Sequence, residues 1–294
     1  MKKLLLLCFL LTIAFTAKGQ DLIPFESEGK KGFKDTTGKE IIPPIYDYIS
    51  RIGTNLERRV RQGQKWGAID KSGVVIVPIQ YDGISNFYNN SYKVRMGKKY
   101  GLIYPDLKLV PELKYDHFEE FEDEEGFFFL VKAADKFGYI NILGKEFIPL
   151  KYDFARPFQE GYSTVRKEGR WYFLNKNGEE FPIFYNGTEN FENVSELTNG
   201  FSTVTFKGKK GFIDKNRKLV VPIIYDDASL YYGGRAEVKL SDKWGVIDES
   251  GNIITPIEYD KIQINDNNQN ITATKNATNF YFNKNGKTIT KPKE

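Results

Sequence analysis

A pattern that recurs about every 35 residues constrains the fold of this chain more than any other feature of its sequence. Taking Gly67 as the reference, the equivalent positions are Gly32, Gly67, Gly101, Gly138, Tyr172, Gly211, Gly245 and Phe280. A tyrosine follows in each of the first seven copies, at Tyr46, Tyr81, Tyr115, Tyr152, Tyr185, Tyr225 and Tyr259. A unit of this length cannot bury enough apolar surface alone, so we expect neighbouring copies to stack and share a core.

Each copy is predicted to be a small antiparallel β module of three strands. In the copy KWGAIDKSGVVIVPIQYD, Asp70 and Gly73 occupy the first and last positions of a four-residue turn that closes a hairpin. Pro78 lacks an N–H, so the strand after this turn should stop or lie at a sheet edge nearby. The third strand precedes the anchor, where segments such as residues 91–96 alternate apolar and polar side chains.

These modules predict an all-β fold, a single array over residues 20–294 with about seven full repeats and a partial eighth. We expect an open, twisted, solenoid-like stack. A closed propeller-like ring is the alternative, although propeller blades normally carry four strands in about 40 residues. Arg217 stands where most copies have the turn glycine, so we expect that it either adopts a positive φ or changes the turn, at a cost of about 1 kcal/mol.

The N-terminus predicts a cleavable signal peptide over residues 1–19. Lys2 and Lys3 precede an apolar run that is too short to span a bilayer, and small residues then suit cleavage before Gln20. The single cysteine, Cys8, lies inside the apolar run rather than at its end, so we do not expect a lipoprotein anchor. The predicted product is secreted, periplasmic or held at the cell envelope, and it has no cysteine to form a disulfide.

The charge balance argues against nucleic-acid binding. Removal of the leader would lower the net charge from +4 to +1, because three basic and no acidic residues leave with it. A protein that binds phosphates would concentrate positive charge instead. No second apolar stretch approaches membrane-spanning length, so we expect no membrane span in the product.

The segment Lys65–Asp82 and its counterpart KWGVIDESGNIITPIEYD, Lys243–Asp260, resemble WG repeats, bacterial modules named for their Trp-Gly pair. The resemblance covers roughly residues 31–290 and is strongest at Trp66-Gly67 and Trp244-Gly245. It implies a noncatalytic repeat protein of a kind that is often exported. It brings no catalytic residues with it.

The composition leaves little material for catalysis or metal binding. Without the leader, the chain has no cysteine and one histidine, His117, which we expect in an exposed loop, so neither a nucleophile–base pair nor a zinc site is expected. Recurring aspartates such as Asp70 are better explained as turn residues, because a catalyst would be needed once. We therefore expect no enzyme and no cofactor. The acidic run FEEFEDEEG is a weak calcium candidate through Glu122, Asp123 and Glu124, although a solvated hairpin tip is the simpler interpretation.

One register of the repeat holds a ring in five copies: Trp66, Tyr100, Phe137, Trp171 and Trp244. Two interpretations compete for these rings. As core residues, each would bury about 150–250 Å² and join one module to the next. As an exposed ladder, they would stack on sugar rings. The glycine that follows most of them favours the core, because it implies a close backbone approach.

The leading functional prediction is a noncatalytic secreted or envelope protein that presents an extended surface to a protein partner. The alternative is a carbohydrate-binding module for peptidoglycan or polysaccharide that uses the aromatic ladder. Exposure of Trp66 and Trp244 on one face would favour this alternative.

Overall fold

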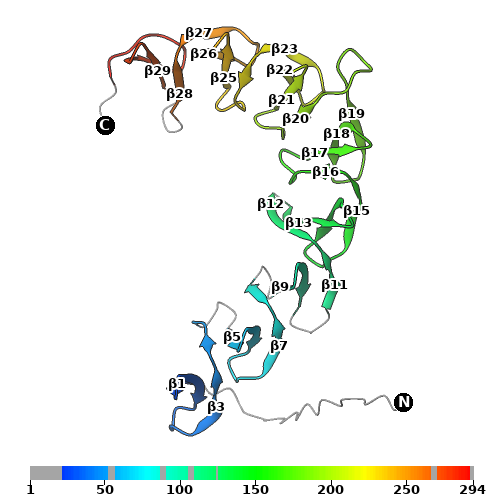
Figure 1. Cartoon of the computed structure of the whole chain (residues 1–294), viewed down its shortest axis with the longest axis vertical. Helices are drawn as coiled ribbons and strands as arrows, with labels where there is room; N and C mark the ends of the chain where they lie inside the picture. Colours follow the sequence, from blue (N-terminus) through cyan, green and yellow to red (C-terminus); the bar gives the residue numbers. More distant parts are fainter. Residues whose placement is uncertain are drawn as a thin grey trace. The chain divides into compact units, whose positions relative to one another are not determined.

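The computed structural model describes residues 22–51, 57–86, 91–104, 109–123, 125–265 and 270–291, which form β-strands and turns without a helix (Figure 1). The predicted signal peptide, residues 1–19, lies outside the described residues. Across the described ranges, no helix has the length and apolar character needed to cross a membrane. The chain divides into two compact units, Met1–Lys114 and Tyr115–Glu294.

Unit 1 holds three antiparallel sheets whose strands follow chain order. Sheet 1 consists of β1 (Ile23–Ser27), β2 (Lys30–Lys34) and β3 (Glu40–Tyr46). Sheet 2 consists of β4 (Tyr48–Ile49), β5 (Arg58–Gln62), β6 (Lys65–Ile69) and β7 (Val75–Tyr81). Sheet 3 consists of β8 (Gly83–Asn86), β9 (Tyr92–Met96), β10 (Lys99–Ile103) and β11 (Leu109–Tyr115), whose last residue opens unit 2.

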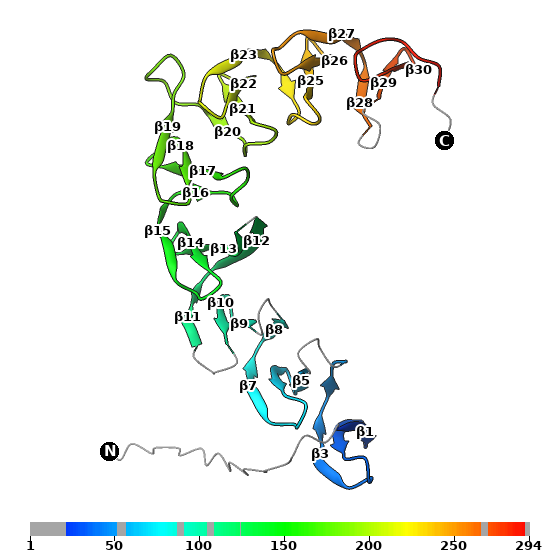
Figure 2. The same cartoon turned by 180° about the vertical axis from the view of Figure 1, so that it is seen from behind.

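Unit 2 continues with five sheets of the same kind, seen from behind in Figure 2. Sheet 4 consists of β12 (His117–Asp123), β13 (Gly126–Ala133), β14 (Lys136–Asn141) and β15 (Glu146–Tyr152), and sheet 5 of β16 (Phe154–Ala155), β17 (Tyr162–Lys167), β18 (Arg170–Asn175) and β19 (Glu180–Ile183). Sheet 6 consists of β20 (Asn193–Val194), β21 (Phe201–Phe206), β22 (Lys209–Asp214) and β23 (Leu219–Tyr225). Sheet 7 consists of β24 (Asp227–Ala228), β25 (Arg235–Leu240), β26 (Lys243–Asp248) and β27 (Ile253–Tyr259), and sheet 8 of β28 (Lys261–Ile264), β29 (Ile271–Lys275) and β30 (Thr278–Phe282).

The predicted all-β fold of repeated antiparallel modules is confirmed, with a difference in the strands of each module. Six of the eight sheets in the described residues have four strands rather than the three expected. The additional strand comes directly after the Tyr-Asp pair in most modules, and it has two residues in β4, β16, β20 and β24. Two residues are too few for an alternating pattern to reveal a strand. The single array over residues 20–294, and its open rather than ring-like form, stay predictions.

Within each unit, hydrophobic cores lie between consecutive sheets. In unit 1, one cluster joins sheets 1 and 2 through Leu22, Phe33, Tyr46, Val60 and Ile69, and another joins sheets 2 and 3 through Ala68, Val77, Tyr81, Tyr92, Val94 and Ile103. Sheet 2 therefore buries both faces, because adjacent residues of β6 point in opposite directions. In unit 2, four clusters join the five sheets in the same way. Within each unit, the predicted sharing of a core between modules is confirmed.

A bulge opposite the anchor glycine is common to these modules. Trp66 pairs with Tyr81, but the pairing shifts across Gly67, so this one residue lies opposite residues 78–80 of β7. A Cβ on Gly67 would lie 2.5 Å from the carbonyl oxygen of Val77. The same shift occurs in four other sheets, opposite Gly32, Gly138, Gly211 and Gly245. β7 is an edge strand, as its proline predicted, and it continues through the bulge to its end.

The turns between the last two strands have the predicted chemistry. The Oδ1 atom of Asp70 accepts hydrogen bonds from the N–H groups of Ser72 and Val74, both at 2.9 Å. The N–H of Gly73 donates to the carbonyl oxygen of Asp70 at 3.0 Å, and its φ is +86°. Arg217 occupies the equivalent position with a φ of 69°, so of the two expected alternatives it adopts the positive φ and the turn is kept.

A second kind of turn joins the strand before the anchor position to the strand that carries it, as between β29 and β30 in sheet 8. This turn places two consecutive residues at positive φ. In sheet 8 these residues are Asn276, with φ 49°, and Ala277, with φ 61°. Such a turn favours Asn-Gly, because glycine adopts positive φ without a steric penalty. We expect Ala277→Gly to raise the free energy of unfolding by about 1 kcal/mol, measured by chemical denaturation. Ala273→Gly in the interior of β29 is the control and should lower it; destabilisation by Ala277→Gly would contradict the turn assignment.

Candidate functional site

The five predicted rings occupy the same place in five sheets. Each is the second residue of its strand: Trp66 in β6, Tyr100 in β10, Phe137 in β14, Trp171 in β18 and Trp244 in β26. Trp171 is buried, with 4% of its surface exposed, and the other four are half-buried. Trp171 belongs to the core between sheets 5 and 6, and Phe137 packs against the core between sheets 4 and 5, so these two rings contribute to packing between sheets.

A cationic side chain of the protein lies over each of these rings. In four sheets the cation is the residue paired with the ring across the hairpin. The distances to the ring centroid are 5.7 Å for Arg61 over Trp66, 5.4 Å for Lys132 over Phe137, 5.7 Å for Arg166 over Trp171 and 6.0 Å for Lys239 over Trp244. In sheet 3, Lys93 lies 6.0 Å from the ring of Tyr100. A ring face that stacks on a cation is not available to a sugar.

In three sheets, a second aromatic side chain from the first strand of the same sheet packs against the predicted ring. The centroid separations are 5.4 Å for Tyr48 and Trp66, 6.0 Å for His117 and Phe137, and 5.7 Å for Phe154 and Trp171. All three pairs meet edge to face, the usual geometry of aromatic packing. His117 is exposed, as expected, but it is the first residue of β12 rather than a loop residue.

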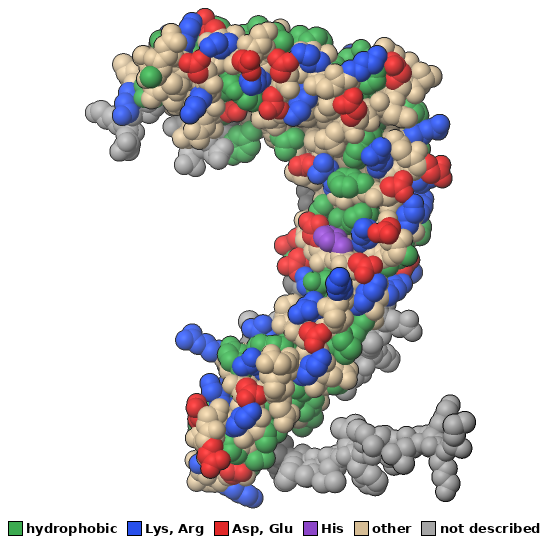
Figure 3. Space-filling model, viewed as in Figure 1, with side chains coloured by type: hydrophobic (Ala, Val, Ile, Leu, Met, Phe, Trp, Pro, Cys, Tyr) green, Lys and Arg blue, Asp and Glu red, His purple; other side chains and the backbone are tan. Residues whose placement is uncertain are grey.

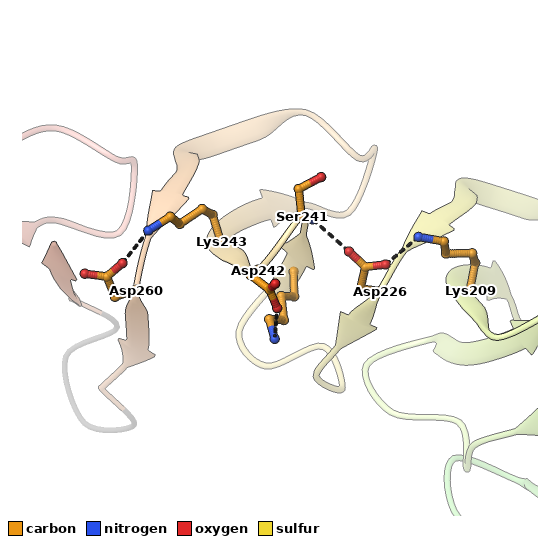
Figure 4. A network of polar contacts seen from close by, with 7 residues as sticks. Lys209, Asp226, Ser241, Asp242, Lys243 and Asp260 are labelled. Carbon is orange, nitrogen blue, oxygen red and sulfur yellow. Dashed lines mark hydrogen bonds and ion pairs between the residues drawn. The ribbon is translucent and has the colours of Figure 1, made fainter. Parts of the chain in front are cut away.

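In five of the Tyr-Asp pairs, the aspartate bonds to two sheets at once, as Figure 4 shows for Asp226. One carboxylate oxygen forms an ion pair with Lys209 in sheet 6, and the other accepts the N–H of Ser241 in sheet 7 at 2.7 Å. The hydrogen bond from Lys209, followed by that from Ser241, holds the pKa of Asp226 below its ordinary value. We call this arrangement the carboxylate clamp. It fixes the hairpin turn of one sheet against a lysine of the preceding sheet.

The clamp recurs along both units. Its lysine, aspartate and turn residue are Lys30, Asp47 and Gly63; Lys65, Asp82 and Gly97; Lys136, Asp153 and Glu168; and Lys243, Asp260 and Asn276. The fifth copy has Asn186 in place of the aspartate, and there the carboxylate of Glu192 accepts the N–H of Gly208 at 3.2 Å. Our sequence interpretation missed the lysine, although its constant spacing of 17 residues from the aspartate was a readable signal.

In sheet 5, the carboxylate of Glu180 in β19 is surrounded by three donor side chains. Lys167 donates to it at 2.7 Å, the hydroxyl of Tyr152 donates at 2.9 Å, and Lys151 lies 2.8 Å away. The carboxylate is 18% exposed. Burial raises its pKa, but the hydrogen bonds from Lys151, Lys167 and Tyr152 outweigh burial and lower the pKa to about 2.

We expect the stability of unit 2 to fall as the pH drops from about 4.5 to about 2. A carboxylate with a lowered pKa in the folded state contributes stability above its ordinary pKa and loses it as the pH falls through the folded value. At neutral pH, Glu180→Gln should cost about 1–2 kcal/mol after allowance for solvent around the lysines. Chemical denaturation at neutral pH and near pH 2 checks this; an equal difference between variant and parent at both pH values would contradict it.

The predicted calcium candidate is only partly within the described residues. Glu124 lies outside them, and Asp123 forms an ion pair with Lys176 at 2.6 Å. Among the described residues, no group of three or more carboxylate, histidine or cysteine side chains is placed to hold a metal ion. A cavity of about 370 Å³ is lined by Asp123, Glu125, Glu160, Gly161, Lys176 and Asn177. Lys176 forms ion pairs with two of the carboxylates that line this cavity, Asp123 at 2.6 Å and Glu125 at 3.2 Å.

The repeats that contain these rings and carboxylate clamps also match a known protein family. The profile of the WG containing repeat matches residues 32–55, 66–100, 137–171, 211–244 and 244–275, more than half of the chain. The chain belongs to the WG containing repeat family. In this WG-repeat protein, the tryptophan of the Trp-Gly pair is one of the rings that lie under a cationic side chain. The glycine leaves space for the bulge of the next strand.

Comparison with solved structures finds weak similarities across much of the chain. A eukaryotic initiation factor has 7% identity and a TM-score of 0.46, with 92% of this chain and 84% of that chain covered. A protein of unknown function from Bacteroides caccae has 16% identity and a TM-score of 0.29, with 66% and 89% covered. The tricorn protease has 11% identity and a TM-score of 0.38, with 83% and 30% covered. Comparison with curated protein sequences gives no match, so the family assignment rests on the repeat profile.

Proposed function

We propose that this WG-repeat protein is noncatalytic and binds a protein partner through exposed aliphatic side chains on the edge strands of its sheets. The observation that supports this is the contrast between covered rings and exposed aliphatic residues. The rings of the repeat register lie under the protein's own cations. By contrast, Leu219, Ile224 and Ile253 on the edge strands of sheets 6 and 7 are 39%, 48% and 60% exposed. Exposed aliphatic side chains suit a protein surface better than a sugar.

Carbohydrate binding is the second candidate function. Three tyrosine or phenylalanine rings outside the five predicted positions are exposed: Tyr48 at 40%, Tyr232 at 46% and Phe280 at 38%. Exposed rings of this kind can stack on the apolar face of a sugar, as in peptidoglycan or a polysaccharide. Tyr48 belongs to unit 1, and the other two lie in different parts of unit 2, so they support this candidate less than a continuous ladder would.

A pull-down from cell-envelope fractions, run beside a glycan array, separates the two candidates. Two variant pairs are compared with the parent protein: Leu219→Lys with Ile253→Lys, and Tyr232→Ala with Phe280→Ala. We expect a protein to be retained by the parent and by the ring variants, and to be lost with the lysine variants. Glycan binding that disappears with the ring variants would support the second candidate instead. Binding of neither class would contradict both.

The proposed location is outside the cytoplasm, after removal of residues 1–19. N-terminal sequencing of the protein recovered from envelope and culture fractions tests this, and we expect Gln20 as the first residue. Recovery of a cytoplasmic chain that retains the leader would contradict the proposal.

A further inference from the structure

β12 is an edge strand that differs from the first strands of the other four-stranded sheets. The order β12-β13-β14-β15 leaves one side of β12 without a neighbouring strand in its sheet. It has seven residues, whereas the first strands of the other four-stranded sheets have two or four. In an antiparallel ladder, the N–H and C=O groups of every second residue of an edge strand point away from the sheet. β12 therefore carries the longest such row among the first strands of the described four-stranded sheets.

No feature of β12 interrupts this row. Its seven residues pair with β13 in continuous register, from His117 opposite Lys132 to Asp123 opposite Gly126. The opposite edge strand, β15, carries Pro149 and has a register shift against β14. Proline and bulges are usual devices that keep other strands away from an edge. Sheet 4 has these devices at β15 and lacks them at β12.

The side chains of β12 determine which partner strand it can accept. Glu119, Glu120 and Glu122 are exposed, and Figure 3 shows acidic side chains around the single histidine. Glu119 lies 3.2 Å from the ring nitrogen of His117, and Asp123 pairs with Lys176. Within the described ranges, Glu120 and Glu122 form no ion pair with a basic side chain. Two exposed carboxylates on an unpaired edge attract positive charge.

We propose that β12 binds a basic, extended segment of the protein partner as an additional strand of sheet 4, an inference that rests on the proposed function. The backbone of this segment pairs with the outward N–H and C=O groups of β12, and its lysine or arginine side chains meet Glu120 and Glu122. A second copy of β12 is a poor occupant, because pairing two such strands would place acidic side chains opposite one another.

Three short peptides test this inference on the full chain at low salt. The first alternates lysine and valine, the second is the same peptide with every second backbone nitrogen methylated, and the third has glutamate in place of lysine. We expect the lysine peptide to bind and the other two peptides to have Kd values at least about tenfold higher. Fluorescence anisotropy measures all three. Methylation removes N–H donors but keeps the charge, so it separates strand pairing from simple charge attraction.

Two double variants supply the matched control. Glu120→Lys with Glu122→Lys should weaken binding of the lysine peptide by about tenfold or more. Glu168→Lys with Glu189→Lys makes the same change of net charge at exposed positions of unit 2 and should leave the Kd unchanged. Circular dichroism verifies that both variants fold. Equal binding of the methylated peptide, or equal weakening by the control pair, would overturn the inference.

The outcome also distinguishes this inference from the proposed function. If no peptide binds but the pull-down still retains a protein that the Leu219→Lys and Ile253→Lys variant loses, the role of β12 is wrong and the proposed function stands. If neither the peptide nor a protein partner binds, both are wrong.

Discussion

Gly67→Ala is expected to lower the free energy of unfolding of unit 1 by about 3 kcal/mol. A Cβ at this position would lie 2.5 Å from the carbonyl oxygen of Val77, 2.7 Å from Cγ1 of Ile79 and 2.9 Å from its Cα. Two of these atoms belong to the backbone of the bulge, so no side-chain rotation relieves the overlap. The bulge must open, which disturbs the pairing of Trp66 with Tyr81 and the core between sheets 2 and 3.

Gly83→Ala is the matched control for this substitution. Gly83 lies in the same unit, and its Cβ would meet the nearest atoms, those of the Arg95 side chain, at 3.6 to 3.8 Å. These are ordinary contacts, so we expect a change within about 0.5 kcal/mol. Chemical denaturation with hydrogen exchange of residues 57–86 measures both variants. Equal stability of the two variants would show that the anchor glycine is not needed for the bulge.

The features that could be predicted from the sequence are those that depend on near neighbours. Asp70 and Gly73 lie three residues apart, and the turn between them follows from their own hydrogen bonds and φ angles. The place of Arg217 in the repeat predicted either a positive φ or a changed turn, and the residue adopts the positive φ. The acidic run was interpreted as a hairpin tip, but most of it, residues 118–123, lies in strand β12, and the turn of the hairpin comes only after Asp123. Stacking followed from the inability of one short module to bury a core.

The features that were not predicted depend on contacts between strands or sheets. The Trp66 register could be read as a core or as an open ladder, because the cation that covers each ring comes from a neighbouring strand. The carboxylate clamp was missed because Lys209 and Asp226 meet only after their strands are placed in space. The two-residue first strands were missed because so short a segment has no pattern of its own.

Trp171→Ala is expected to lower the free energy of unfolding of unit 2 by about 3–5 kcal/mol. The ring is 4% exposed, lies in the core between sheets 5 and 6, and meets Phe154 edge to face at 5.7 Å. Its removal leaves a cavity that the flanking strands cannot fill without breaking their ladders, and it uncovers Arg166 as well. Tyr232→Ala, which removes a ring that is 46% exposed, is the control and should change stability by less than about 0.5 kcal/mol. Chemical denaturation of both variants and a glycan array decide the role of this ring. Loss of stability in Trp171→Ala would show that the ring is part of the core between modules. A stable Trp171→Ala protein that loses glycan binding would instead show that the ring stacks on a sugar.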